Sequence, residues 1–244
     1  MDRNLKPCIV NFHIPRTGGR TRAKFLSDIV GDQQIFHTMG PEKREFSEYE
    51  QMSANEKRDI RLITGHMPFT FMSSVLKPKF CITFVRNAIY RTLSHYNAFK
   101  SWKGHPISEL IHDNNLSLRD FLLSGIRHDI YDNVMVRYFL EQPPPFMKVQ
   151  KVHLVEAKNN LYNYMNFVGV TEHTDFCLNL LAHIFGNKKQ LNIQHVGSMK
   201  QERKLPKLNP SDIEALHRVN EYDLDFFDYA FRLFKKQTAI YLGE

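Results

Sequence analysis

Long apolar runs are missing from this sequence of 244 residues. No stretch approaches the ~18 consecutive apolar residues that a membrane-spanning helix needs. The first residues, 1 to 7, also lack the apolar core of a secretory signal peptide. We therefore expect a soluble, cytoplasmic protein that does not associate with a membrane.

Cysteine is scarce as well. The chain has three cysteines, Cys8, Cys81 and Cys177, and two of them stand inside apolar runs. An odd number of widely separated cysteines does not form a disulfide framework. We expect small, buried thiols in a reducing compartment.

Internal repeats and low-complexity segments are also lacking, apart from the proline run 143–145, which predicts a rigid turn. Hydrophobic residues make up 42% of the chain, enough for one substantial core. The sequence therefore predicts a single domain spanning residues 1–244.

Positive charge is in excess. The chain has 33 Lys and Arg against 26 Asp and Glu, a formal net charge of +7. Such a surface favours anionic partners, among them phosphates, sulfates, nucleic acid and acidic glycans. Charge alone does not choose among these.

Short apolar runs alternate with helical patterns along the chain. The runs, 8–14, 61–65 and 80–85, are nearly continuous, as strands of a parallel sheet covered on both faces are. Helical patterns occupy 88–101, 117–124, 133–140 and 171–185, and a last helix is expected from Pro210, capped by Asn209, to beyond Leu233. The basic segment 187–208 is expected to be a loop. This order predicts an α/β fold with a central parallel sheet flanked by helices.

A candidate phosphate-binding loop, His13-Ile14-Pro15-Arg16-Thr17-Gly18-Gly19-Arg20-Thr21, links the first strand to a helix. The two glycines let the backbone approach an anion, the threonine hydroxyls donate hydrogen bonds, and the helix presents its positive end. The alternative is an ordinary strand-to-helix turn with solvated arginines. A Walker loop would need glycine at position 14 and lysine at position 20, so a magnesium-dependent kinase or ATPase is disfavoured.

Arg86 and Ser94 form a second candidate anion site. Arg86 follows the strand 80–85, and Ser94 lies about two helical turns further on. A strand end and a helix face can then hold one phosphate between them, for which the planar fork of arginine is suited. The alternatives are an arginine paired with a surface carboxylate and an unremarkable hydroxyl on a helix face.

These two segments carry a resemblance. The loop resembles the Pro-Lys-Thr-Gly-Gly-Thr-Ser/Thr signature of sulfotransferases that use 3′-phosphoadenosine 5′-phosphosulfate (PAPS), especially the heparan sulfate 6-O and 2-O branch and its bacterial relatives. The run Arg86 to Tyr96 is similar to that family's Arg-Asp/Asn-Pro-x-x-Arg-x-x-Ser-x-Tyr motif. Weaker similarities lie at Asp132-Asn133-x-x-x-Arg137, at the 168–172 turn and at Asn220-x-x-Asp223, so the resemblance spans about residues 8 to 235.

The resemblance implies a P-loop-like sulfotransferase fold with PAPS as cofactor and no metal. The 5′ end of PAPS would then be held by the loop residues Arg16, Thr17, Gly18, Gly19, Arg20 and Thr21. Arg86 and Ser94 would hold its 3′-phosphate. Two departures are evident, because Arg16 stands in place of the family's lysine and Arg20 in place of a hydroxyl residue. Arg16 can neutralise charge on the departing phosphate, but it cannot donate a proton.

Transfer of a sulfuryl group to a hydroxyl also needs a base. His66 ends the second apolar run, where the strand should open onto the ligand side of the sheet, and it resembles the histidine that supplies the base in the 6-O branch. The alternative is a strand-end histidine satisfied by local backbone, and His37 is the reserve base. His13 is expected to be buried.

We therefore expect a sulfotransferase with Arg16 and His66 as catalytic residues, acting on the hydroxyl of a glycan or small molecule and not on nucleic acid. Two alternatives remain. One is a non-catalytic basic protein that binds polyanions, and the other is a phosphotransferase with a divergent P-loop.

Overall fold

The computed structural model describes residues 7–31, 34–39, 43–76, 78–186, 193, 196 and 207–243. Most of the expected basic loop 187–208 lies outside these residues. Within them, no helix is long and apolar enough to cross a membrane.

A five-stranded sheet, with every pairing parallel, forms the centre of the molecule. Its strands run in the order β2-β3-β1-β4-β5. Their bounds are β1 (Cys8–Phe12), β2 (Ile35–His37), β3 (Leu62–Gly65), β4 (Lys79–Val85) and β5 (Phe167–Val170). The predicted α/β fold with a central parallel sheet is confirmed. Two strands were missed: β2, and β5, whose residues were taken for a turn. β2 has three residues, and β5 has four with a glycine inside it, so neither forms a continuous apolar run in the sequence.

The register places the carboxyl ends of β1 and β3 at the same level, while β4 continues to Val85. Phe12 of β1 lies opposite Gly65 of β3 on one side and Thr83 of β4 on the other. The residues that follow β1 and β3, His13 and His66, therefore emerge side by side. This is the edge at which open parallel sheets bind ligands.

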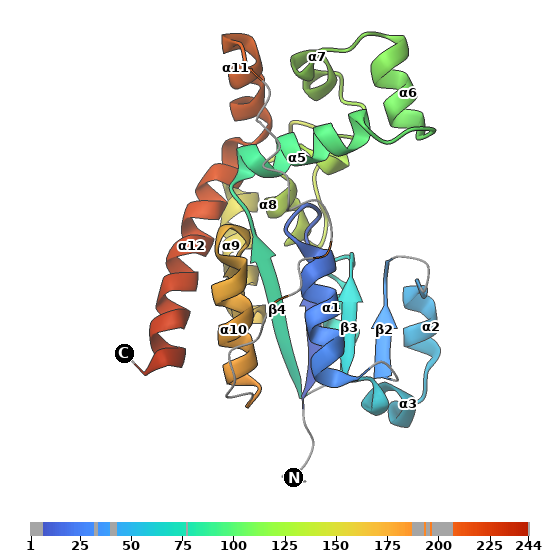
Figure 1. The fold of residues 1–244 in the computed structure, drawn as a ribbon, viewed down its shortest axis with the longest axis vertical. Coiled ribbons are helices and arrows are strands. Elements are labelled where there is room, and N and C mark those ends of the chain that lie inside the picture. The colour runs from blue at the N-terminus through green and yellow to red at the C-terminus, as the bar shows by residue number, and fades with distance from the viewer. Residues whose placement is uncertain are drawn as a thin grey trace.

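Helices cover both faces of the sheet (Figure 1). They are α1 (Gly19–Val30), α2 (Phe46–Gln51), α3 (Ala54–Asp59), α4 (Phe71–Ser74), α5 (Ala88–Lys100), α6 (Pro106–Asp113), α7 (Leu118–Leu123), α8 (Val134–Tyr138), α9 (Lys151–Tyr164), α10 (Thr174–Ile184), α11 (Pro210–Val219) and α12 (Glu221–Leu242). The side chain of Arg22 on α1 lies over the Phe84 ring of β4. On the opposite face, Phe12 of β1 contacts Tyr138 and Phe139 next to α8. Alternation along the strands thus sends neighbouring side chains into two different layers.

A second apolar cluster lies beyond the carboxyl ends of the strands, where α5 crosses above the sheet and carries α6, α7 and α11 (Figure 1). Its buried residues are Leu93, Tyr96, Phe99, Ile107, Ile111, Leu118, Phe121, Leu122, Ile130, Tyr131, Ala215, Leu216 and Val219. The larger cluster surrounds the sheet. Helix α5 joins the two, since its first residue, Ala88, belongs to the larger cluster. The single domain over residues 1–244 stays a prediction.

The expected last helix is two helices that meet at Asn220. Its start is as predicted, because Asn209 caps α11 and accepts a hydrogen bond from the Asp212 amide at 2.8 Å. The break has a physical cause. Asn220 is fully buried, and its side chain donates to Leu216 O at 2.8 Å and accepts from the Thr92 hydroxyl at 2.9 Å. These bonds tie the chain to α5 at the point where it turns.

Candidate anion and base site

The loop between β1 and α1 turns sharply at two positions. Arg16 and Gly18 have φ angles of 69° and 77°, in the left-handed region that favours glycine. Gly19 is needed for a different reason, because a Cβ atom there would lie 2.0 Å from Nε2 of His13. The two glycines therefore have separate roles. Gly18 permits the turn, and Gly19 leaves room for the His13 ring at the start of α1. His13 is buried, as predicted.

The two threonines of the loop point into the protein. The Thr17 hydroxyl is fully buried and donates to Ile14 O at 2.8 Å. The Thr21 hydroxyl, also buried, accepts from the backbone N–H of Val196 at 3.0 Å. In this structure both side chains support the shape of the loop, while Arg20 is exposed at the start of α1. Their contacts with PAPS stay predictions.

The two predicted anion-binding segments meet. The Arg16 guanidinium donates to the Ser94 hydroxyl oxygen through Nε at 3.1 Å and Nη2 at 2.9 Å. Arg86 in turn donates through Nη1 to the backbone oxygen of Arg16 at 3.2 Å. Both arginines and Ser94 are half-buried. Burial lowers the pKa of Arg86, and the nearby Glu172 carboxylate raises it again. The structure thus brings two guanidinium groups and a hydroxyl to the end of the loop, which is a suitable donor set for phosphate.

His66 lies beside the loop. Its ring stacks on that of His13, with centroids 4.7 Å apart and planes 20° from parallel. Its Nδ1 atom is 2.9 Å from the His13 backbone oxygen. Because a carbonyl only accepts, Nδ1 carries the proton and Nε2 keeps a lone pair in the neutral ring. Burial lowers the pKa of His66, the bond to His13 O raises it, and Arg22 lowers it. The net effect is a pKa below the ordinary value, which favours the neutral ring that can accept a proton.

The other histidines are less suited to act as a base. His37 lies on the edge strand β2, in register with Thr64 of β3, one strand further from the loop than His66. His95 follows Ser94 but points into the second cluster, where its Nδ1 donates to Ile130 O at 3.1 Å. Burial and the neighbouring Arg91 lower the pKa of His95 to about 3. His37 remains the reserve prediction.

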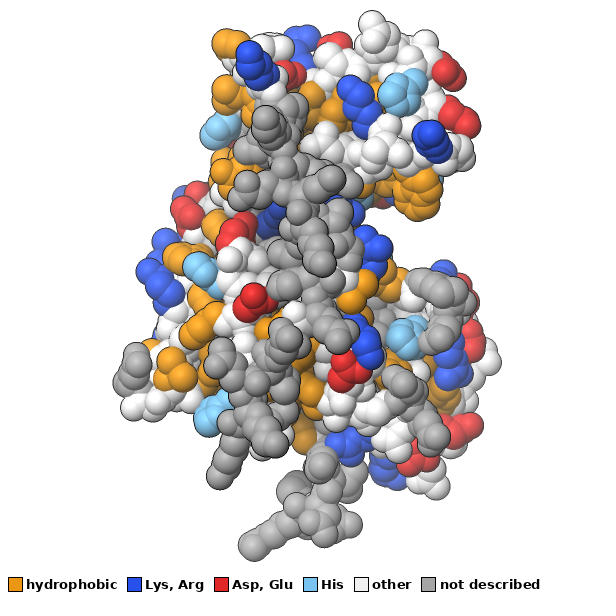
Figure 2. All heavy atoms as spheres, in the orientation of Figure 1, with side chains coloured by type: hydrophobic (Ala, Val, Ile, Leu, Met, Phe, Trp, Pro, Cys, Tyr) orange, Lys and Arg blue, Asp and Glu red, His pale blue; other side chains and the backbone are white. Residues whose placement is uncertain are grey.

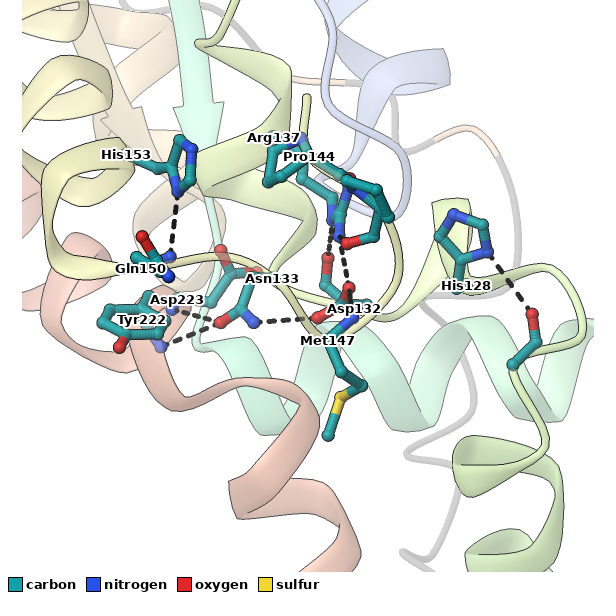
Figure 3. Close-up of polar contacts among 12 residues, drawn as sticks. His128, Asp132, Asn133, Arg137, Pro144, Met147, Gln150, His153, Tyr222 and Asp223 are labelled. Carbon is teal, nitrogen blue, oxygen red and sulfur yellow. Dashed lines mark hydrogen bonds and ion pairs between the residues drawn. The ribbon is translucent and has the colours of Figure 1, made fainter. Parts of the chain in front are cut away.

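The weaker similarity at 132–137 belongs to a supporting network (Figure 3). The Asn133 side-chain oxygen accepts from the amides of Tyr222 and Asp223 at 2.8 and 3.2 Å, and so caps α12. In return the Asp223 carboxylate accepts from the amides of Met135 and Val136 at 3.0 and 2.9 Å, and so caps α8. The two helices cap each other across a separation of about 90 residues.

A buried ion pair between Arg137 and Asp132 continues this network (Figure 3). Arg137 also donates to the backbone oxygens of Pro144 and Pro145, which anchors the predicted proline turn. Together these bonds fix α8, whose Tyr138 places its hydroxyl 3.5 Å from Nδ1 of His66. The segment therefore holds Tyr138 in position next to His66.

Arg22 is the residue that sequence reasoning missed. It is 1% exposed, and its guanidinium contacts Asn11, His13 and the backbone oxygen of Thr17 beneath the loop. Its position could have indicated burial, because Arg22 falls on the face of α1 that buries Phe25 and Leu26. A charge on the apolar face of a helix needs an explanation.

Within the described part of the chain, no group of three or more His, Cys, Asp or Glu side chains could hold an ion. The surface is hollowed beside the lobe that carries α6 and α7, and Lys, Arg and apolar side chains lie at its edge (Figure 2). In the orientation shared by Figures 1 and 2, the hollow lies between this lobe and the carboxyl ends of β2 and β3.

No family model and no curated protein matches this sequence. Among solved structures, the chain is similar to the crystal structure of mouse sulfotransferase SULT7A1 complexed with PAP, with a TM-score of 0.45 and 14% sequence identity. The match covers 90% of this chain and 65% of that chain, so this chain spans less than two thirds of that protein's length. Similarity at this level assigns no function to this chain.

Proposed function

We propose that this chain transfers a sulfuryl group from PAPS to the hydroxyl of an acceptor. The proposal is carried by the meeting of two motifs that are 70 or more residues apart in the sequence. Arg16 of the loop donates to Ser94, and Arg86 donates to the backbone of Arg16. PAPS carries negative charge at its 5′ end and at its 3′-phosphate, and a site for it needs two such donor groups side by side.

The donors present fit this nucleotide. Arg16 to Thr21 would hold the 5′ end with the loop backbone, the positive end of α1 and the arginine side chains. Arg86 and Ser94 would hold the 3′-phosphate. The Ser94 oxygen accepts both of its bonds from Arg16, so its own hydroxyl hydrogen remains available to a phosphate oxygen.

The chemistry divides between two residues. When bound, PAPS supplies an activated sulfuryl group whose transfer leaves 3′-phosphoadenosine 5′-phosphate (PAP). Arg16 stabilises the negative charge that grows on the departing phosphate, and it acts through its fixed charge because it keeps its proton. His66 accepts the proton of the acceptor hydroxyl at Nε2, while its bond to His13 O holds the ring in place.

The acceptor is proposed to be a glycan or a small molecule with a free hydroxyl. It would enter through the hollow next to the α6 and α7 lobe (Figure 2). Lys and Arg at the edge of the hollow favour an acceptor that is itself anionic. We do not propose nucleic acid as a partner.

Calorimetry distinguishes this function from its alternatives. PAP should bind saturably at one site, more tightly than ATP and without magnesium. Tighter binding of ATP that requires magnesium would instead identify a divergent phosphotransferase. Heparin binding that vanishes with salt, in the absence of saturable PAP binding, would identify a non-catalytic polyanion-binding protein.

A further inference from the structure

Arg22 carries a buried positive charge directly beneath the loop. Its Nε donates to the Asn11 side chain at 2.6 Å, its Nη1 to Thr17 O at 3.0 Å, and its Nη2 to Nδ1 of His13 at 2.9 Å. The guanidinium also lies 4.3 Å from the centre of the Phe84 ring. One side chain therefore joins β1 to both ends of the turn.

All of these partners are neutral. Among the residues that the structure describes, no carboxylate forms an ion pair with Arg22. Burial lowers the pKa of Arg22 to about 9, which leaves it protonated at pH 7. An isolated charge in a protein interior is costly unless an opposite charge compensates it. We therefore look for the compensating negative charge in a bound ligand.

The charge on Arg22 affects the protonation of the neighbouring His13 ring. A guanidinium only donates, so Nδ1 of His13 accepts and the proton of the neutral ring sits on Nε2. Burial and Arg22 hold the pKa of His13 well below its usual range. Nε2 is the atom that packs against Gly19 at the start of α1. Arg22 therefore sets the tautomer of the ring on which both the loop and His66 rest.

We propose that Arg22 is a positioning residue that shapes the loop from below and supplies the buried positive charge that a loop-bound phosphate compensates. This inference rests on the proposed function, because it assumes that the 5′ end of PAPS binds at the loop. It adds a charge that is hidden from solvent and therefore little screened by salt. It also explains why a core position of α1 holds arginine.

The test compares two nucleotides that differ at the loop. PAP carries a 5′-phosphate and adenosine 3′-phosphate does not, while both carry the 3′-phosphate. Arg22→Gln keeps a hydrogen-bond donor but removes the charge. It should weaken PAP binding on the order of tenfold to a hundredfold and leave adenosine 3′-phosphate unchanged. Lys24→Gln, which removes an exposed charge from the same helix, is the matched control and should alter neither affinity.

The outcomes separate the two proposals. If the wild-type chain binds PAP no better than adenosine 3′-phosphate, the loop holds no phosphate and the proposed function is wrong. If wild-type binding of PAP is strong and Arg22→Gln keeps it, or loses both nucleotides equally, the role of Arg22 is wrong.

A measurement on the wild-type chain guards against a variant that fails to fold. Nitrogen-proton correlation NMR of histidine-labelled protein should show His13 protonated at Nε2 and His66 protonated at Nδ1. His13 protonated at Nδ1 would overturn the proposal without any substitution of Arg22.

Discussion

Replacing the proposed base tests the site most directly. His66→Ala should lower the rate of sulfuryl transfer on the order of 10²–10⁴-fold and leave the affinity for PAP within about twofold. The split is expected because the ring contacts His13 and Tyr138, and its described contacts do not include Arg86 or Ser94. His37→Ala is the matched control and should keep full activity.

The structure also sets the pH profile of this reaction. An ordinary histidine with a pKa of about 6.5 is roughly three-quarters neutral at pH 7. Burial lowers the pKa of His66 below that value, so a larger fraction is neutral. kcat/KM should therefore rise with pH along an acid limb whose midpoint lies below 6.5, and it should be flat around pH 7. His66→Ala should abolish that limb.

The assay is transfer from sulfur-labelled PAPS to a panel of sugars, glycans, alcohols and phenols, with PAP affinity measured separately by calorimetry. Full activity in His66→Ala together with loss in His37→Ala would place the base on β2. A wild-type acid limb with its midpoint above 6.5 would contradict the assignment of a buried, neutral imidazole.

Four further predictions follow from single contacts. Arg86→Ala should weaken PAP on the order of tenfold to a hundredfold but leave adenosine 5′-phosphate unchanged by calorimetry, and equal losses would refute its assignment to the 3′-phosphate. Arg16→Lys keeps the charge but cannot reproduce both bonds to the serine hydroxyl, so PAP affinity should fall by less than about tenfold with the transfer rate retained; a rate loss of a hundredfold would show that the arginine fork itself is required. Gly19→Ala should cost about 1–3 kcal/mol in urea unfolding, because the new Cβ meets the His13 ring, and an unchanged midpoint would refute that contact. The pKa of His95 is about 3 in the folded chain and about 6.5 in the unfolded chain, so the unfolded chain binds more protons below pH 6.5 and the free energy of unfolding falls as the pH drops. His95 alone accounts for a fall of about 2 kcal/mol by pH 5. His95→Gln should make the fall smaller in thermal unfolding measured across this pH range.

Local sequence determined the parts of this protein that depend on neighbouring residues. The turn before α1 could be predicted because glycine at position 18 adopts a left-handed conformation at no steric cost. The start of α11 could be predicted because Asn209 and Pro210 act on the helix that they begin. The parallel sheet was likewise signalled by short apolar runs, each of which reports its own burial on both faces.

The tertiary structure decided everything that depends on partners distant in the sequence. The break at Asn220 is set by its bond to Thr92 on α5, and the reciprocal caps of Asn133 and Asp223 join segments that no local pattern connects. The partners that hold Arg22 beneath the loop, Asn11, His13 and Thr17, could not be identified from its position on α1 alone. The physical reason is the same in each case. A hydrogen bond or a compensated charge depends on two groups, and a local stretch of sequence contains only one of them.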